Sequence, residues 1–320
     1  MGVLSSPAYV GGVMNTCVGI DVSKDELVVH VLPTEAARTF PNTADGRADL
    51  LGWLLPQPHP RVVFEASGGY ERDLLDTLHH AGLNAVRLPP RRPRALAQAL
   101  GLKAKTDAID ARVLAVAAQL LPAAPTVPLT AATRVLREWL QVRTALVGER
   151  DRLRRRRLHW RDPAVQAWAE EHIAQLQARI AATDRHLKQA LAACPTSLSA
   201  APGLGPILRA TLAARLPELG TLDRRRIAAL VGLAPYNRDS GPWKGQRRIS
   251  GGRPDVRRVL YMATWAAIRA RSPLAETYRR LVEAGKPKKL AVTACMRKYL
   301  TMLNAMQRDN LPWYPKGSSA

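Results

Sequence analysis

The segment from Cys17 to Leu120 alternates short apolar runs with amphipathic stretches, and this order restricts the folds that the chain can adopt. The alternation predicts strands at 18–21, 27–32, 38–40, 61–65 and 84–88, and helices at 44–55, 71–81, 91–100 and 107–120. In chain order these are three strands, a helix, a strand, a helix, a strand and two helices. Strands and helices in such an order predict an α/β domain built on a central sheet.

Four carboxylates occupy particular places in this pattern. Asp21 ends the first predicted strand and Glu65 ends the fourth. Asp107 and Asp110 stand three residues apart on the last predicted helix, so they share one face of it. The order of elements is that of the ribonuclease H-like fold, in which the first and fourth strands are neighbours. In that fold the four carboxylates would lie close together.

The predicted cluster offers only oxygen ligands, which suit Mg²⁺, or Mn²⁺ in its place, and do not suit zinc. One or two such ions can activate a hydroxyl or a water molecule against a phosphodiester and stabilise the leaving oxygen. The cluster therefore predicts an enzyme that cuts or joins nucleic acid.

The charge of the chain agrees with a polyanionic partner. Lysine and arginine together number 48 against 26 aspartates and glutamates, which gives a formal net charge of +22. A globular protein this basic usually binds nucleic acid. A generally arginine-rich proteome is an alternative explanation of the charge, but it does not account for where the carboxylates stand.

Basic side chains near the predicted sites and helix ends are the candidate contacts to nucleic acid. The candidates are Arg91, Arg92, Arg94, Lys103, Lys105, Arg154, Arg155, Arg156, Arg157, Arg238, Lys244, Arg247, Arg248, Arg253, Arg257 and Arg258. For the run from Arg154 to Arg157, a solvated charged face is an equally good interpretation.

The length of 320 residues predicts two domains, joined here by a helical connection. We expect a flexible leader at 1–16, the α/β domain at 17–121, a linker and two long helices at 122–195, a mainly helical domain at 196–312 and a tail at 313–320. The leader lacks a basic segment followed by a long apolar core, and no apolar stretch reaches the ~18 residues of a membrane span. The protein is therefore expected to be cytoplasmic and without a membrane partner.

Two apolar stripes with roughly heptad spacing lie between residues 135 and 191. One is formed by Val135, Trp139, Val142, Leu146 and Leu153, and the other by Ile173, Leu176, Ile180, Leu187 and Leu191. Arg161-Asp162-Pro163 separates the two. The stripes predict two antiparallel helices, with a coiled coil that also pairs with another chain as one form of this arrangement.

The helical domain contains two loops with candidate functions. The segment 201–206, before a predicted helix, resembles a helix-hairpin-helix turn that binds phosphate at a helix N-terminus, although a plain Gly/Pro loop fits as well. The polar segment 236–253 carries Ser240 and Ser250, each beside a glycine and among arginines. Ser240 is the better candidate nucleophile, since Ser250 stands where it would cap the helix predicted from Pro254 or shape a turn. Taken alone, Asp239-Ser240-Gly241 is an ordinary turn.

Several segments of the chain match a known family in its own order. They are Gly19-Ile20-Asp21-Val22-Ser23-Lys24, Glu65-Ala66-Ser67-Gly68-Gly69-Tyr70, Lys105-Thr106-Asp107-Ala108-Ile109-Asp110-Ala111-Arg112, Pro202-Gly203-Leu204-Gly205, Gly232-Leu233-Ala234-Pro235, Asp239-Ser240-Gly241 and Arg257-Arg258-Val259-Leu260-Tyr261. The chain resembles the bridge-RNA-guided insertion-sequence recombinases, which have a DEDD metal site and a catalytic serine and are related to the Piv-type DNA invertases. The segment 105–112 is highly specific, and Ser67 stands where many members have threonine.

The resemblance implies a RuvC-like nuclease domain, a coiled-coil linker and a helical transposase domain. It implies that Asp21, Glu65, Asp107 and Asp110 bind Mg²⁺, and that Ser240 attacks the phosphodiester to form a covalent phosphoserine. It also implies that a structured noncoding guide RNA pairs with donor and target DNA. The protein is expected to act as a homo-oligomer, a dimer or tetramer, in which two protomers complete one site.

Two rival interpretations remain open at the level of sequence. In the first, the protein is a RuvC-like endonuclease or junction resolvase that uses water as its nucleophile, and Ser240 is a turn residue. In the second, it is a non-catalytic nucleic-acid-binding protein whose acidic residues cap helices and lie on the surface. A covalent protein–DNA adduct separates recombination from the first, and loss of Mg²⁺-dependent chemistry in Asp21→Asn excludes the second.

Overall fold

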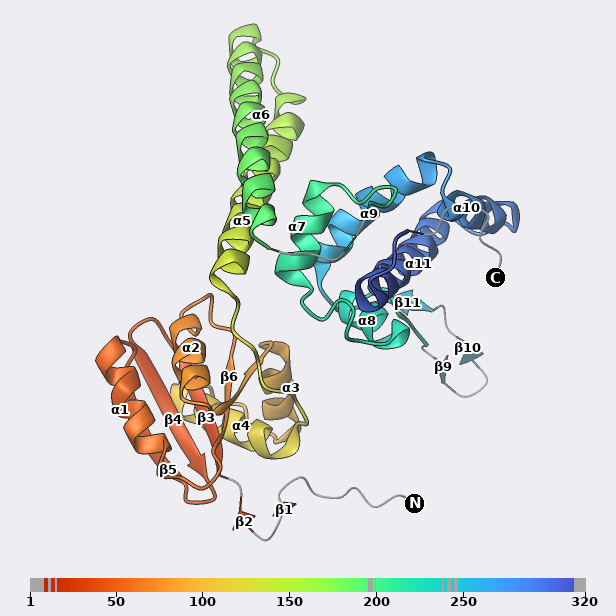
Figure 1. Ribbon diagram of the computed structural model, residues 1–320. Coiled ribbons are helices and arrows are strands. Elements are labelled where there is room, and N and C mark those ends of the chain that lie inside the picture. Colours follow the sequence, from red (N-terminus) through yellow and green to blue (C-terminus); the bar gives the residue numbers. More distant parts are fainter. Residues whose placement is uncertain are drawn as a thin grey trace. The chain divides into compact units, whose positions relative to one another are not determined.

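The structure is a computed structural model that describes residues 9–10, 13–14, 16–194, 198, 200–237, 239–240, 243–244 and 247–313. For residues 9–14, 239–240 and 243–244 it describes the backbone only. The chain forms two compact units, which divide between Pro128 and Leu129 (Figure 1). The first unit is mixed α/β and the second is mostly helical, as the α/β plus α fold class predicts.

The first unit is built on a five-stranded sheet with the order β5-β4-β3-β6-β7. Its strands are β3 (Cys17–Val22), β4 (Glu26–Leu32), β5 (Ala36–Pro41), β6 (Arg61–Glu65) and β7 (Asn84–Leu88). Strand β3 pairs antiparallel with β4 and parallel with β6, and β6 pairs parallel with β7. The predicted adjacency of the first and fourth strands is thereby confirmed. A separate pair, β1 (Tyr9–Val10) and β2 (Val13–Met14), precedes the sheet.

Helices cover both faces of this sheet (Figure 1). Helices α1 (Ala44–Leu54) and α2 (Arg72–His80) bury their leucines against Ile20 and Phe64 on one face. Helices α3 (Arg91–Ala99) and α4 (Asp107–Leu120) cover the other, where Leu114 packs with Cys17 and Val63. Successive residues of β3 alternate between the two cores, because side chains of a strand point to opposite faces in turn.

The ends of the first unit differ from the sequence-based expectation. Thr16, assigned to a loose leader, is buried, and its backbone N–H donates to the carbonyl of Pro58. Beyond α4, in the stretch assigned to a linker, Thr126 donates its N–H to the Ala85 carbonyl and accepts from the Arg87 N–H through its hydroxyl. Both stretches therefore pack against the ends and the edge of the sheet, because their backbone groups find partners there.

The second unit consists mainly of seven helices among the residues described. They are α5 (Ala131–Arg157), α6 (Pro163–Ala192), α7 (Pro206–Arg215), α8 (Arg224–Val231), α9 (Pro254–Arg269), α10 (Pro273–Glu283) and α11 (Lys288–Asp309). Asp162 caps α6 by accepting the N–H groups of Ala164 and Val165, and the Ser272 hydroxyl caps α10. The predicted break before Pro163 is confirmed. Within the described segments, no helix is long and apolar enough to cross a membrane.

Helices α5 and α6 pack along each other, but the predicted stripe on α5 is wrong at Val135 and Val142, while Trp139, Leu146 and Leu153 are partly buried. Leu136 and Leu140 are buried, whereas Val135 and Val142 are 46% and 44% exposed. The first half of α5 packs against α7 as well as α6, in a cluster that includes Ala210 and Leu187. This second neighbour turns the buried face by one residue. The stripe on α6 is confirmed, since Ile173, Leu176, Ile180 and Leu187 are all buried.

Candidate carboxylate centre at the end of the sheet

Two of the predicted carboxylates stand side by side at the ends of neighbouring strands. The parallel pairing of β3 and β6 runs from Cys17 opposite Arg61 to Ile20 opposite Phe64. Asp21 and Glu65 are the next residue on each strand, and each is partly buried. Because paired residues of parallel strands face the same side of a sheet, both carboxylates lie on the face that α4 covers.

Helix α4 approaches this face unusually closely at Gly19. A Cβ atom at Gly19 would lie 2.0 Å from the Ala111 carbonyl oxygen and 2.2 Å from the Ala115 nitrogen. Gly19 is two residues before Asp21 on the strand, and Ala111 directly follows Asp110 on the helix. The glycine therefore lets the helix bring its first turn next to Asp21.

The first turn of α4 carries both remaining carboxylates. The Thr106 hydroxyl caps the helix by accepting the Ile109 N–H at 3.3 Å. Asp107 and Asp110 lie in this turn, where the positive end of the helix dipole favours negative charge. Lys105 adds a cation, with its Nζ 4.0 Å from Asp110 Oδ2.

The carboxylates lie close enough to alter one another's protonation. Burial, followed by the negative charges of Asp107, Asp110 and Glu65, raises the pKa of Asp21 to about 6, and Lys105 opposes this shift. Burial also raises the pKa of Glu65, with Asp110 adding to the shift and Arg94 and Lys105 opposing it. Negative charges that repel one another in a partly buried site favour the binding of a cation there.

The donors fit a hard divalent ion in chemistry. Every one is a carboxylate oxygen, and together they concentrate negative charge at one place. Within the part of the chain that the structure describes, however, no three His, Cys, Asp or Glu side chains are arranged so that they could hold a metal ion together. The structure thus brings the four predicted residues into one neighbourhood without closing a ligand shell.

Glu71 is a residue of this region that sequence reasoning missed. Its buried carboxylate accepts the backbone N–H groups of Ser67 at 3.1 Å and Gly69 at 2.9 Å, and it pairs with Arg87 Nη1 at 3.2 Å. These bonds shape the loop that directly follows Glu65, in which Gly69 has a φ of +117°. An acid that closes a double-glycine loop after a strand is the available signal, whereas the apolar period predicts Glu71 only as the start of a helix.

The predicted serine nucleophile belongs to a short local pairing in the second unit. Strand β9 (Asp239–Ser240) pairs antiparallel with β10 (Trp243–Lys244), so that Ser240 stands opposite Trp243. A second pair joins β8 (Pro235–Tyr236) to β11 (Arg248–Ile249). The side chains of Ser240 and Lys244 and the whole of Arg238 lie outside the described residues.

Ser250 does not cap α9, so that part of its predicted role is wrong. The residue at the N-cap position is Arg253, and Ser250 lies exposed in the preceding bend. Gly251 and Gly252 follow it with φ values of +66° and +70°. The backbone turns here before the helix begins, which moves Ser250 too far upstream to reach its free N–H groups.

Most of the predicted basic contacts are exposed. On the first unit these are Arg91, Arg92, Arg94, Lys103 and Lys105, and on the second they are Arg154, Arg155, Arg156, Arg247, Arg248 and Arg258. Arg157 pairs with Glu170 of α6. Long cationic side chains on a surface are available to phosphates, so these positions stay candidates.

Two further predicted contacts, Arg253 and Arg257, also have partners within the fold. Arg253 holds both carboxylate oxygens of Glu218, at 2.5 and 2.6 Å, and also donates to the Arg215 carbonyl. Arg257 Nη1 donates to the carbonyls of Val231 and Gly251. Their guanidinium groups fasten the start of α9 to neighbouring segments.

Comparison with known proteins agrees with the arrangement of these sites. Residues 18–159 match a family model of IS110 DEDD transposases, described as Transposase, and residues 196–279 match one described as Transposase IS116/IS110/IS902 family. The two matched segments follow in order and together take in more than half of the chain, which defines it as an insertion-sequence transposase. It belongs to the IS116/IS110/IS902 family.

Some individual relatives match nearly the whole chain, and another matches part of it. The pilin gene-inverting protein of Moraxella lacunata is 26% identical over 93% of this chain and 97% of its own length. The corresponding protein of Moraxella bovis is equally similar, at 26% over the same shares. An uncharacterized 42 kDa protein of insertion element IS900 from Mycobacterium paratuberculosis is 36% identical over 37% of this chain and 31% of its own.

Proposed function

We propose that this protein is a DNA recombinase that moves an insertion sequence by cutting and rejoining DNA with the help of Mg²⁺ or Mn²⁺. The observation that carries the proposal is the meeting of Asp21, Glu65, Asp107 and Asp110 at one end of the sheet, where burial and then the charges of the other three raise the pKa of Asp21 to about 6. Family membership and the DNA-inverting function named for the Moraxella relatives support it. The strand order supports a RuvC-like nuclease domain at 17–121. In this proposal a linker with two long helices at 122–195 and a transposase domain at 196–312 follow it.

The four carboxylates would hold the divalent ion. When bound, such an ion polarises the phosphodiester and stabilises the oxygen that leaves it. The carboxylates of β3 and β6 are fixed by the sheet, and the close approach at Gly19 brings the first turn of α4 next to them. Arg94 and Lys105 stand near enough to shift the protonation of Glu65, so they are placed to bind the phosphate of a DNA strand beside the ion.

Ser240 is the nucleophile in this proposal. Its Oγ loses its proton and attacks the phosphorus, and the bond from phosphorus to the leaving oxygen breaks. The leaving oxygen takes up one proton, so the proton that the serine gives up is balanced as the phosphoserine forms. Attack by a hydroxyl of another strand on the phosphoserine reverses these changes and rejoins the DNA. One phosphodiester bond is exchanged for another, so no ATP is needed. Arg238, Arg247 and Arg248 are the proposed partners of the phosphate.

Partners follow from the same proposal. Donor and target DNA are the substrates, and a structured noncoding guide RNA selects them by pairing. The protein acts as a homo-oligomer in which the carboxylates of one protomer and Ser240 of another complete a site. The exposed basic side chains supply the phosphate contacts, so binding of both nucleic acids should weaken strongly with salt.

Alanine substitution of the carboxylates tests the proposal. Asp107→Ala and Asp110→Ala should each abolish Mg²⁺-dependent strand cleavage and retain most binding of DNA and RNA in a gel-shift assay. Arg297→Ala, a change in α11 of the second unit, is the control and should leave cleavage intact. Normal recombination by both aspartate variants would refute the site.

A further inference from the structure

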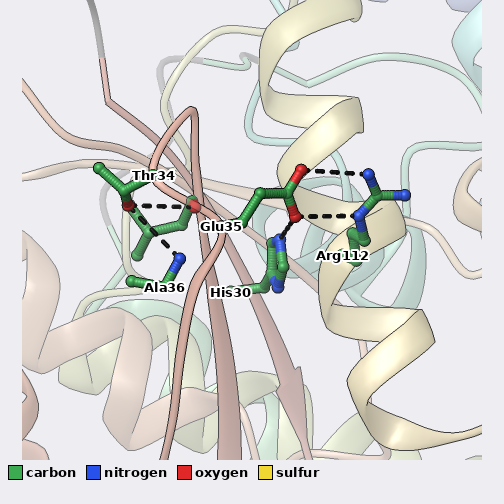
Figure 2. Close-up of polar contacts among 6 residues, drawn as sticks. His30, Thr34, Glu35, Ala36 and Arg112 are labelled. Carbon is green, nitrogen blue, oxygen red and sulfur yellow. Dashed lines mark hydrogen bonds and ion pairs between the residues drawn. The ribbon is translucent and has the colours of Figure 1, made fainter.

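The turn between β4 and β5 contains a glutamate in a conformation that L-residues seldom adopt. Glu35 has a φ of +55°, in the left-handed region. A conformation of this kind persists where the surroundings determine it. In Glu35 the surroundings are two basic side chains, one from a strand and one from a helix (Figure 2).

Both carboxylate oxygens of Glu35 are engaged. Arg112 donates from Nε to Oε2 at 3.2 Å and from Nη2 to Oε1 at 3.1 Å, which is the bidentate geometry of the strongest ion pairs. His30 of β4 shares Oε2 through its Nε2 at 2.8 Å. The hydrogen bonds from Arg112, followed by that from His30, lower the pKa of Glu35, so the carboxylate is charged at neutral pH.

Arg112 connects this turn to the carboxylate centre. It stands two residues after Asp110, on the same helix and next to Ala111, which contacts the strand at Gly19. The buried face of α4 consists largely of small side chains, including Ala111, Ala115, Ala117 and Ala118. Small side chains allow close approach but interlock weakly, so they do not by themselves fix the position of a helix along its axis. A directional ion pair beside them supplies a constraint on the position of the helix along its axis.

The pair is too exposed to act mainly through global stability. The side chains of Glu35 and Arg112 are 51% and 53% exposed, and exposed ion pairs contribute little to the free energy of unfolding. What distinguishes this pair is where it is attached. It joins the sheet to the helix whose first turn carries Asp107 and Asp110.

We propose that Glu35 is a positioning residue for the carboxylate centre, which acts through Arg112 to hold α4 where Asp107 and Asp110 face Asp21 and Glu65. The inference rests on the proposed function for its consequence, which is binding of a divalent ion. Its structural content, the fixing of α4 by Glu35, stands apart from that function and can be measured separately.

The substitution Glu35→Asn removes the clamp, because asparagine tolerates a positive φ but is too short to reach Arg112. Affinity for Mn²⁺ is measured on the full-length protein without nucleic acid, from the electron paramagnetic resonance signal of free Mn²⁺. The variant should bind Mn²⁺ about tenfold more weakly, the usual loss when a group that orients metal ligands is removed. Amide hydrogen exchange should become faster in the first turn of α4.

Two further variants separate positioning from a general loss of structure. Asp73→Asn removes another ion pair of the same unit, that of the exposed Asp73 carboxylate with Arg47 at 3.6 Å, and should change neither Mn²⁺ affinity nor exchange in α4. Arg112→Met should reproduce Glu35→Asn, and the double variant should be no worse than either, because both changes break one link. Additive losses would show that Glu35 does not act through Arg112.

Failure of the inference and failure of the proposed function give different results. Unchanged exchange in α4 of Glu35→Asn would overturn the clamp, whatever the ion does. Faster exchange with an unchanged Mn²⁺ affinity would overturn its role in the carboxylate centre. A wild-type protein that binds no Mn²⁺, with exchange in α4 still faster in the variant, would overturn the metal site and leave the clamp of α4 standing.

Discussion

The carboxylate centre and the serine segment are built in opposite ways. Asp21 stands between Ile20 and Val22, which are 0% and 5% exposed, on a central strand with a helix packed over it. Ser240 stands on a strand of two residues, and in the neighbouring pair Tyr236 and Ile249 are 48% and 37% exposed. The first site is held by the core of its unit and the second by short local pairing. The comparison teaches that the proposed metal ligands are preorganised by the core of their unit, whereas we expect the proposed nucleophile to depend on what binds beside it.

The largest expected effect on stability within this comparison is that of Gly19→Ala. The new methyl group would lie 2.0 Å from the Ala111 carbonyl oxygen, and α4 must move to make room. We expect a loss of about 3 kcal/mol in the free energy of unfolding, measured with urea, together with loss of strand cleavage. Gly52→Ala on α1 is the matched control, because no atom lies within 4 Å of its Cβ position. It should be stabilising by roughly 0.5 kcal/mol. A harmless Gly19→Ala would contradict the close approach of α4.

A smaller loss is expected for Glu71→Gln. The amide keeps the size of the side chain but removes the charge that Arg87 and two backbone N–H groups bind. Hydrogen bonds to a charged group contribute about 2 kcal/mol, and the loop after Glu65 should lose much of this support. Urea unfolding gives the change, and Asp73→Asn in α2 should stay within about 0.5 kcal/mol of the wild type. If Glu71→Gln and Asp73→Asn had the same free energy of unfolding, the loop would not depend on Glu71.

The smallest expected effect is a gain in stability on Asp21→Asn, and it depends on pH. In the folded protein the pKa of Asp21 is raised from 3.8 to about 6. Between these two pH values the folded state binds a proton that the unfolded state does not, so the free energy of unfolding falls as pH rises. The destabilisation is complete above a pH of about 6. In the presence of a chelator, the variant should exceed the wild type by about 1 kcal/mol at pH 8, less than the full shift because water still screens the carboxylate. The difference should vanish near pH 4. A variant that is less stable at pH 8 would contradict the crowding of charge at this site.

The sequence predicts the parts of this protein that repeat a simple period. The apolar runs around Asp21 and Glu65 predict two strands, and the order of elements predicts that those strands are neighbours, as the sheet confirms. The starts of α6 and α10 can be predicted as well, because a capping residue before a proline acts within one turn of the chain.

Contacts between distant residues escape such reasoning. Glu35 and Arg112, or Arg253 and Glu218, become partners only when separate elements pack, and no local pattern marks them. The predicted stripe on α5 fails at Val135 and Val142 because the position of α7 beside the helix cannot be predicted from the period of α5 alone. The need for a glycine at position 19 likewise arises only from the helix that crosses it.

The central claim is that Ser240 and the carboxylates act in one reaction, and the direct measurement is the mass of a trapped protein–DNA complex after digestion to peptides. Wild-type protein, incubated with its DNA and RNA in Mg²⁺ and quenched, should carry a nucleotide on the peptide that contains Ser240. Ser240→Ala and Asp21→Asn should both lack the adduct while still binding DNA and RNA, and Ser250→Ala should retain some of it. A nucleotide on Ser250, or hydrolysed DNA ends with no adduct on any peptide, would contradict the account.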